Sequence, residues 1–307
     1  MTIDMRTRQF GRLFSEGREA GAPMSLGERR QRRARLFAET KLQVCARVAI
    51  STAIALRRMG VRGALGALDC LVRDRAIGAV GLPDPACARA HPAGLCGAVA
   101  GASAETIMEG YARGLHAGSN FGLLTWWSPP SRMTVAPEAF VTPAPVRALL
   151  ETGGLSVTLD RDFDAVVAAC GKRKRLSGRL LHLYAGLHEM GFAHSFEVRD
   201  PVGKLVAGGF GLAIGRVYVT LGLWAERPDQ AGLGLAIFNR HLVRLGFALH
   251  DGLDAPGLGD FGFSPMARED YFEALIAHSG FSRLGRWQAA PELCGAREPA
   301  EALLAAA

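Results

Sequence analysis

The sequence lacks the cysteine pattern, the leader segment and the long apolar run that mark several classes of protein. Its six cysteines are scattered without a CxxC pair, which argues against a zinc site and, in a chain of 307 residues, against a disulfide framework. The first residues show neither the apolar core nor the cleavage site of a signal peptide. The most apolar N-terminal run, 44–56, contains Arg47 and is too short to span a bilayer. We therefore expect a cytoplasmic protein.

Charged residues are also few, and they are unevenly placed. They make up 21% of the chain against 49% hydrophobic residues, a composition typical of globular proteins and not of disordered ones. The formal net charge is +7. Residues 1–65 hold fourteen Arg or Lys against five Asp or Glu, a net charge of +9, which leaves −2 for the rest of the chain. An acidic or phosphate-rich partner would meet the N-terminal part first.

The first hundred residues are expected to form a basic, largely helical extension. Ser25 and Glu28 fit a capping box. Apolar residues interspersed with arginines continue to about Met59, which predicts one long amphipathic helix. This helix either packs on the protein by its apolar stripe or serves as an arm for nucleic acid or another anionic surface. Residues 78–101, rich in Pro, Gly and Ala, are the best candidate for a linker.

Beyond position 103 the pattern alternates between helices and strands. We expect helices over 104–113, 163–169, 178–190, 229–246 and 270–278, and strands over 195–198, 205–211 and 216–223. This order predicts an α/β (α+β) fold around a mostly antiparallel sheet, similar in topology to the GCN5-related acyltransferases. The expected domains are the extension and linker over 1–100, a small domain over 101–145 and an acyltransferase-like domain over 146–307.

Five strings occur in an order and spacing typical of one known family. The sharpest is Trp-Trp-Ser-Pro-Pro-Ser-Arg. The strings span 111–115, 126–132, 183–198, 205–215 and 268–271. On these strings the chain resembles the leucyl/phenylalanyl-tRNA–protein transferases from about Ile107 to Gly280.

The resemblance implies a small domain beside an acyltransferase-like domain, with no metal and no organic cofactor. It implies transfer of leucine or phenylalanine from the 3′ end of its tRNA to the α-amine of a protein that begins with Lys or Arg. Because the donor ester is already activated, the protein mainly positions both substrates and helps to deprotonate the amine. The substrate-binding residues implied are Trp126, Trp127, Ser128, Arg132, His194, Ser195, Glu197, Gly208, Gly209, Tyr218, Leu221 and Trp224.

The chain departs from the family where the chemistry would lie. Leu221 stands where the family has a glutamate that contacts the aminoacyl group, and Glu226 lies five residues further on. Allowing a one-residue slip, Asp251 takes the place of the family's proton-handling aspartate, but Gly252 follows where a glutamine is expected. The candidate catalytic residues are therefore Asp251 and His250.

A basic run offers a second partner-binding feature. Lys172, Arg173, Lys174 and Arg175 precede a predicted helix and suit phosphate contacts of a nucleic acid, although a solvated loop would look the same. His194 invites a catalytic interpretation, but a histidine at the start of a strand is more often structural.

Three functions remain open. The favoured one is a tRNA-dependent aminoacyltransferase with altered specificity, whose partners are an aminoacyl-tRNA or other activated donor and an amine or protein N-terminus, with no membrane. The second is a GCN5-type acyltransferase that would bind acyl-CoA through Gln230, Gly232 and Gly234, although the preceding Asp229 disfavours a pyrophosphate. The third is a non-catalytic descendant that binds RNA or a protein.

Overall fold

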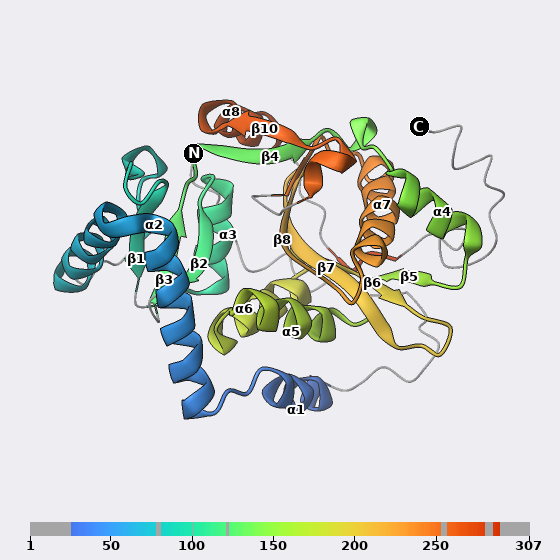
Figure 1. The fold of residues 1–307 in the computed structure, drawn as a ribbon, viewed down its shortest axis with the longest axis horizontal. Helices are drawn as coiled ribbons and strands as arrows, with labels where there is room; N and C mark the ends of the chain where they lie inside the picture. Colours follow the sequence, from blue (N-terminus) through green and yellow to red (C-terminus); the bar gives the residue numbers. More distant parts are fainter. Residues whose placement is uncertain are drawn as a thin grey trace.

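The computed structural model describes residues 26–77, 81–99, 101–120, 123–252, 257–279 and 285–288. Within them the chain forms two sheets (Figure 1). The small unit consists of α2 (Lys41–Ile77), η1 (Pro85–Cys87), β1 (Leu95–Val99), α3 (Ala104–Ala112), β2 (His116–Asn120) and β3 (Leu123–Trp127). The large unit consists of β4 (Ser131–Val135), η2 (Pro137–Ala139), α4 (Ala144–Thr152), β5 (Ser156–Leu159), α5 (Phe163–Lys174), α6 (Gly178–Glu189), β6 (Ala193–Arg199), β7 (Leu205–Ile214), β8 (Val217–Ala225), α7 (Pro228–Arg244), β9 (Leu249–Asp251), η3 (Leu258–Phe261), β10 (Ser264–Ala267) and α8 (Arg268–His278).

The small unit is a three-stranded antiparallel sheet in the order β1-β3-β2. Trp126, at its centre, is completely buried. Its ring lies against Gly110 of α3, where a Cβ atom would come within 2.5 Å of the indole. A glycine is therefore required at this point for the helix to approach the strand so closely.

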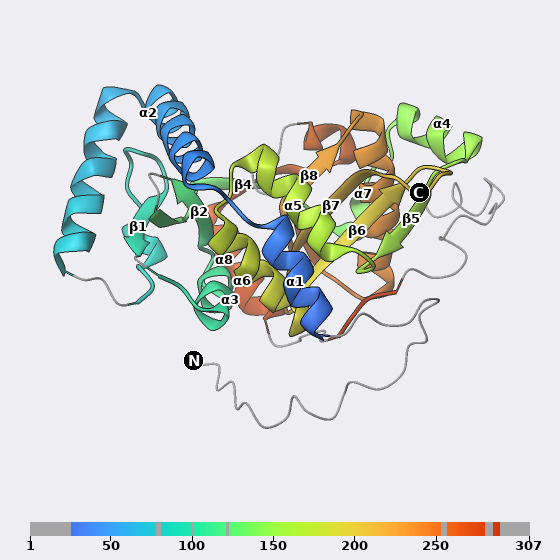
Figure 2. The same ribbon diagram turned by 90° about the horizontal axis from the view of Figure 1, so that it is seen from below.

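The large unit is a seven-stranded sheet in the order β10-β4-β9-β8-β7-β6-β5. Helices α5 and α6 cover one face, and α4 and α7 cover the other (Figures 1 and 2). One apolar core lies beneath α5 and α6 around Val166, Leu180 and Phe210, and a second lies beneath α7 around Phe196 and Phe238. The predicted α/β (α+β) class with a mostly antiparallel sheet is confirmed, as are the helices and strands expected beyond position 103. No helix in the described ranges is long and apolar enough to cross a membrane.

Strands β8 and β9 form the parallel pair of the large sheet, and this pairing is short. Strand β8 pairs with β7 along its whole length, but β9 pairs in parallel only with Val217–Val219. On the β7 side, Phe210 faces Gly222 while Gly211 faces Thr220, so Leu221 is the extra residue of a bulge. A bulge bends a strand and redirects its side chains. From Thr220 onward, β8 is thus redirected at the place where its parallel neighbour ends.

The predicted long helix is wrong, because the chain forms two helices there. Helix α1 (Leu26–Leu36) ends before Phe37, and α2 begins at Lys41. Thr40 and Gln43 cap each other: the Thr40 amide donates to Gln43 Oε1 over 2.8 Å, and the Gln43 amide donates to Thr40 Oγ1 over 3.3 Å. This reciprocal cap is a start signal for a new helix. The cap predicted at Ser25 lies outside the described residues.

Helix α1 packs on the large unit through arginines instead of an apolar stripe. Arg33 Nε lies 2.9 Å from Asp164 and Arg33 Nη1 lies 2.6 Å from Glu189, and Arg32 pairs with Asp162 over 2.8 Å. Arg33 is 8% exposed. Part of the positive charge of the extension is therefore neutralised within the protein, which favours the packed interpretation for α1.

The segment 78–101, predicted as a linker, contains a strand, and its residues 78–80 and 100 lie outside the described residues. Leu95–Val99 forms β1, whose Leu95 and Val99 are buried. The Pro- and Gly-rich composition reflects tight turns before the strand. Sheet membership groups β1 with β2 and β3, and it places β4 in the large sheet. The domain boundaries at 100 and 145 stay predictions, but the change of sheet falls between β3 and β4.

Replacing Arg33 by alanine should destabilise the protein, because it leaves the buried Asp164 carboxylate without its cation. We expect the free energy of unfolding in urea to fall by about 3 kcal/mol. Arg35→Ala, on the exposed side of the same helix, should change it by less than about 0.5 kcal/mol. Equal losses in both variants would contradict the anchoring role of Arg33.

Candidate active-site cleft

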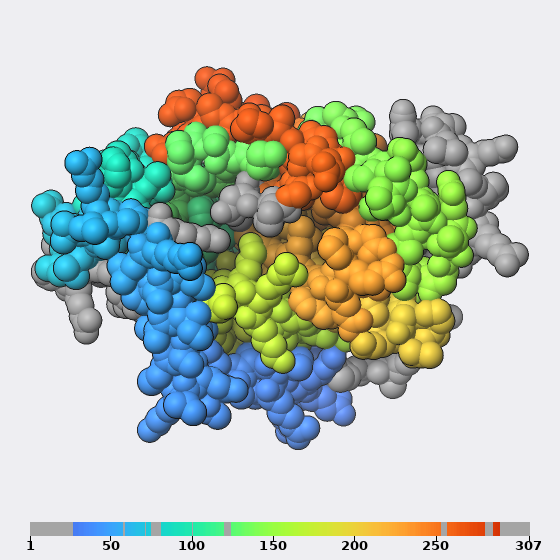
Figure 3. All heavy atoms as spheres, in the orientation of Figure 1, coloured from blue at the N-terminus to red at the C-terminus, as the bar shows by residue number. Residues whose placement is uncertain are grey.

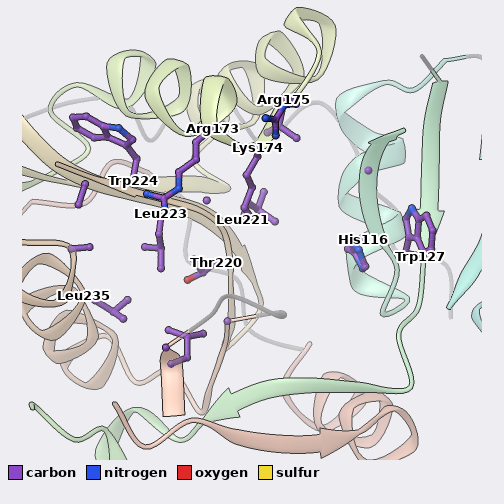
Figure 4. Close-up of a pocket in the computed structure, with 18 of the residues that line it drawn as sticks. His116, Trp127, Arg173, Lys174, Arg175, Thr220, Leu221, Leu223, Trp224 and Leu235 are labelled. Atoms are coloured by element: carbon purple, nitrogen blue, oxygen red, sulfur yellow. The ribbon is translucent and has the colours of Figure 1, made fainter. Parts of the chain in front are cut away.

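A cavity of about 1710 Å³ lies between the small and large units. This volume exceeds the ~300–1,000 Å³ of common small-molecule sites, so the cleft has room for part of a larger ligand. Figure 3 shows the two units side by side on the molecular surface, and Figure 4 shows the lining from within. The lining comes mainly from α2, β2, β3, the ends of α5 and β8, the starts of α4 and α7 and the turn around η3, with single residues from α3 and α6.

One wall of the cleft is apolar. Leu223 of β8 and Leu235 of α7 line the cleft from the side of the sheet that α7 covers, and Leu221 lines it from the side that α5 and α6 cover (Figure 4). Val146 and Phe261 complete this wall. Such a surface favours an uncharged, apolar group of a ligand and disfavours a charge, which would lose its hydration there.

The opposite wall belongs to the small unit. His116 of β2 lies directly across from Trp127 of β3 in the sheet register, and both side chains line the cleft (Figure 4). Burial, with the nearby charges of Arg132 and Lys174, holds the pKa of His116 well below its usual range. The imidazole is therefore neutral near pH 7. Its buried Nδ1 has no hydrogen-bond partner among the described residues.

The rim of the cleft carries charges of both signs. Arg173, Lys174 and Arg175 lie at the end of α5 and are exposed. Glu226 and Asp229 lie at the end of β8 and the start of α7. Each of these carboxylates already has a cation: Glu226 pairs with Lys204 over 2.6 Å, and Asp229 pairs with Arg227. The exposed cations at the end of α5 add positive charge to the rim.

A hydrogen-bonded chain leads from the cleft into the protein. Thr220 lines the cleft, and its Oγ1 lies 2.8 Å from His250 Nε2. His250 Nδ1 lies 3.2 Å from Asn239 Oδ1. His250 itself is completely buried and does not line the cleft. It can act on a substrate only through Thr220.

The predicted catalytic role of Asp251 is not supported by its position. Asp251 is completely buried, and its carboxylate lies 2.8 Å from Arg132 Nη1. Arg132 also donates to the carbonyl of Gly114, and its guanidinium lies 4.4 Å from the centre of the Tyr271 ring. Neither Arg132 nor Asp251 lines the cleft. The pair connects β4, β9 and the turn between α3 and β2.

The predicted histidine-to-glutamate string lies in the core and not on the cleft. His194 Nδ1 lies 2.8 Å from Asp160, and the ring stacks on Trp287. The hydroxyls of Ser195 and Thr158 donate to Glu197. The predicted substrate-binding residues that do not line the cleft are Trp126, Ser128, Arg132, His194, Ser195, Glu197, Gly208, Gly209 and Tyr218. Most of them fill the sheet's interior or form its internal hydrogen bonds, so their pattern reflects packing.

The predicted CoA loop is also built for packing. The Gln230 side chain accepts from the Arg227 amide, and Asp229 holds the first turn of α7 by accepting from the Gln230 amide over 3.1 Å. A Cβ on Gly234 would come within 2.3 Å of the Phe196 ring. Gly232 lines the cleft, whereas Gln230 and Gly234 do not. A carboxylate already occupies this helix start, which opposes a pyrophosphate.

The structure brings seven predicted site residues to the cleft and adds others that the sequence did not indicate. The seven are Trp127, Arg173, Lys174, Arg175, Leu221, Trp224 and Gly232; Lys172 does not line it. The additional lining residues include Tyr111, His116, Tyr184 and Thr220. His116 and Thr220 carry no local signal, because only the strand register places them on a wall. Among the described residues no group of three His, Cys, Asp or Glu could hold a metal ion.

Comparison with known proteins gives a consistent match. A family model described as leucyl/phenylalanyl-tRNA protein transferase matches residues 134–276. The transferase of that name from Pseudomonas fluorescens (strain SBW25) is 30% identical over 213 residues, covering 67% of this chain and 94% of the relative. The one from Azotobacter vinelandii is 30% identical over 228 residues, covering 72% and 99%.

Solved structures show more distant similarity. A crystal structure of FemX has a TM-score of 0.36 at 11% identity, covering 48% of this chain and 64% of that one. A GCN5-related N-acetyltransferase from Kribbella flavida has a TM-score of 0.31 at 18% identity, covering 51% and 58%.

The buried Glu197 should make stability depend on pH. Burial raises the pKa of Glu197 to about 7, although Thr158 and Ser195 donate to it. In the unfolded chain the pKa is near 4.5, so the folded protein binds the additional proton. The resulting stability is complete below pH ~4.5 and is lost as the pH rises through ~7.

Between pH 4.5 and 7.5 the wild-type free energy of unfolding should therefore fall by up to about 3 kcal/mol more than that of Glu197→Gln. Urea unfolding over this pH range measures the difference. Glu151→Gln, at an exposed position, should follow the wild type. Parallel curves for wild type and Glu197→Gln would refute the assignment.

Proposed function

Since the chain belongs to the leucyl/phenylalanyl-tRNA protein transferase family, we propose that it is a tRNA-dependent aminoacyltransferase. It moves an aminoacyl group from its tRNA to an amine such as a protein N-terminus, in a cytoplasmic setting. The observation that carries this proposal is that the cleft combines a large volume, apolar lining and a basic rim. A site that binds an apolar aminoacyl group attached to a tRNA, which is a polyanion, needs these three properties.

The rim suits the phosphates of the donor. Arg173, Lys174 and Arg175 project from the end of α5 beside the apolar wall (Figure 4). Cations placed there neutralise backbone phosphates irrespective of the base sequence. Trp127, on the facing wall, offers a ring on which a terminal base can stack.

The apolar wall suggests a change in donor specificity. At Leu221 the resemblance places a glutamate, and leucine cannot pair with the ammonium of a free aminoacyl group. The neighbouring lining side chains, Leu223 and Leu235, are apolar too. We propose that the site takes apolar aminoacyl groups without reading the charge on their α-nitrogen.

Acyl-CoA transfer is less favoured. The start of α7 carries Asp229 in its first turn, and the glycines of this segment are explained by packing against Phe196, Val146 and Phe261.

A transfer assay tests the proposal. Purified protein is incubated with Leu-, Phe- and Met-tRNA, each labelled in the amino acid, and with a peptide that begins with arginine. Label should appear in the peptide with at least one donor. If no label moves and no charged tRNA binds, the chain is not an aminoacyltransferase.

Replacing Arg173, Lys174 and Arg175 together by alanine should weaken tRNA binding and reduce its salt dependence. Loss of three phosphate contacts should lower the slope of log affinity against log salt by about 2. Filter binding at several salt concentrations measures the slope. Arg147→Ala, an exposed arginine of α4, is the control and should leave it unchanged, and an unchanged slope in the triple variant would exclude the rim as a phosphate site.

Leu221→Glu should restore a preference for a free α-amine. The wild type should use Phe-tRNA and N-acetyl-Phe-tRNA with rates that differ by less than about tenfold. Leu221→Glu should favour Phe-tRNA by roughly 10- to 100-fold, the effect of one charge-assisted hydrogen bond. Leu221→Gln matches glutamate in shape without the charge and should not acquire this preference. A strong wild-type preference for Phe-tRNA would contradict the proposed specificity.

A further inference from the structure

The part of α2 beyond Gly60 lies at the outer edge of the small unit (Figures 1 and 2). Gly60 has a φ of 64° and a ψ of −177°, so the helix bends there and 61–77 form a helical segment of their own. One side of this segment packs inward: a Cβ on Gly66 would come within 2.1 Å of a backbone oxygen, and Ala67 is buried against Leu95 of β1. This packing fixes which side of the segment faces outward.

The outward side carries a row of large apolar side chains. They follow one another at intervals of four, three and four residues, which places them on one line along a helix. They are Val61, Leu65, Leu68 and Val72, and they are 79%, 62%, 58% and 59% exposed. We call these four residues the α2 stripe. Because apolar surface is driven out of water, a row of this kind favours contact with another apolar surface.

The spacing of the α2 stripe is that of the contact positions in a coiled coil. The same four side chains read Val, Leu, Leu, Val in either direction along the helix. If a second copy of the segment packs antiparallel, Leu65 lies opposite Leu68 of the second copy, and Val61 lies opposite Val72. A two-fold interface requires one patch to be complementary to itself, and this order of side chains meets the requirement.

The charges beside the stripe select the same arrangement. Arg62 and Asp69 are seven residues apart and flank the stripe on one side. An antiparallel pair brings the same flanks of both helices together, so Arg62 of each copy lies near Asp69 of the other. Arg62 is exposed, and the Asp69 side chain is 43% exposed although it pairs with Arg89 over 2.9 Å. A parallel pair would instead place this flank against the side of Ala64, which carries no charge.

We propose that the α2 stripe is a docking surface for a second copy of this chain, packed antiparallel. The inference does not rest on the proposed function. The turn on which Gly66 packs contains His91 and Pro92, which line the cleft, and it lies on the opposite side of the helix from the stripe. Pairing therefore leaves the lining of each cleft unchanged.

The length of the stripe limits the strength of the pairing. From Val61 to Val72 a helix rises by about 17 Å, which is short for an interface between two proteins. Such a contact belongs at the small end of specific interfaces. We therefore expect a reversible dimer with a dissociation constant on the order of 10 µM.

Sedimentation velocity of the full chain between about 1 and 100 µM tests the pairing. The wild type should pass from monomer to dimer over this range. Leu65→Lys places a charge in the contact and should raise the dissociation constant at least ~30-fold, with an unchanged melting temperature, because the side chain is exposed in the single chain. Leu42→Lys is the matched control: it is 79% exposed in the part of α2 before Gly60 and should dimerise as the wild type does.

Oxidative cross-linking tests the orientation. An equimolar mixture of Leu65→Cys and Leu68→Cys should form a disulfide between the two chains, because these positions face each other in the antiparallel pair. Each variant alone should link poorly, since its cysteines would be separated along the helix axis. Peptide mapping identifies the linked cysteines.

The flanking charges have a test of their own. Arg62→Asp brings carboxylates together and should raise the dissociation constant about three- to tenfold at low salt, with a smaller effect at high salt. Arg57→Asp makes the same change of net charge at an exposed position before Gly60 and should have little effect. Equal effects of the two variants would contradict the pairing of Arg62 with Asp69 of the second copy.

The remaining outcomes decide against the proposal. A wild type that stays monomeric up to about 100 µM and forms no disulfide in the mixture would overturn it. Self-linkage of Leu65→Cys alone would show a parallel pair. A monomer that sediments with vesicles of phosphatidylglycerol and phosphatidylethanolamine, when Leu65→Lys does not, would make the stripe a membrane contact instead. None of these results affects the transfer assay, because the four residues of the stripe do not line the cleft.

Discussion

The buried ion pair between Arg132 and Asp251 holds the two walls of the cleft in place. Arg132 extends from β4, pairs with Asp251 on β9 and donates to the carbonyl of Gly114 in the small unit. The same guanidinium packs over the ring of Tyr271 from α8. Both charges are almost completely removed from water, so loss of either would leave the other unpaired at a cost of about 3–5 kcal/mol. This contact therefore helps to fix the position of the two walls.

The second constraint is the end of the parallel pairing between β8 and β9. Because β9 pairs only with Val217–Val219, the next residues of β8 form the wall of the cleft instead of the interior of the sheet. Thr220 and the bulged Leu221 are the first two. One side chain is backed by His250, and the other begins the apolar wall.

The hydrophobic pattern of the sequence predicted most helices and strands beyond position 103, but it indicated fewer of the residues that line the cleft. The helices and strands beyond position 103 follow hydrophobic periodicity, which is a local signal. The break before α2 was also locally encoded, by Thr40 and Gln43, but the apolar spacing on both sides concealed it. Strand β1 was missed because Pro and Gly dominate the turns around it.

The site depended on contacts between distant segments, which no local pattern contains. The family resemblance predicted Trp127, Leu221 and Trp224 as substrate-binding residues, and these three line the cleft. It also indicated His194 and Glu197, whose polar groups are used inside the sheet. Asp251 was assigned to catalysis because nothing in the sequence indicates that Arg132, 119 residues earlier, neutralises it. If the reaction takes place in the cleft, hydrogen exchange with a stable, amide-linked phenylalanyl-tRNA tests this most directly. Exchange should slow in β8 from Thr220 onward and in β2 and β3, whereas protection confined to α1, or none, would contradict it.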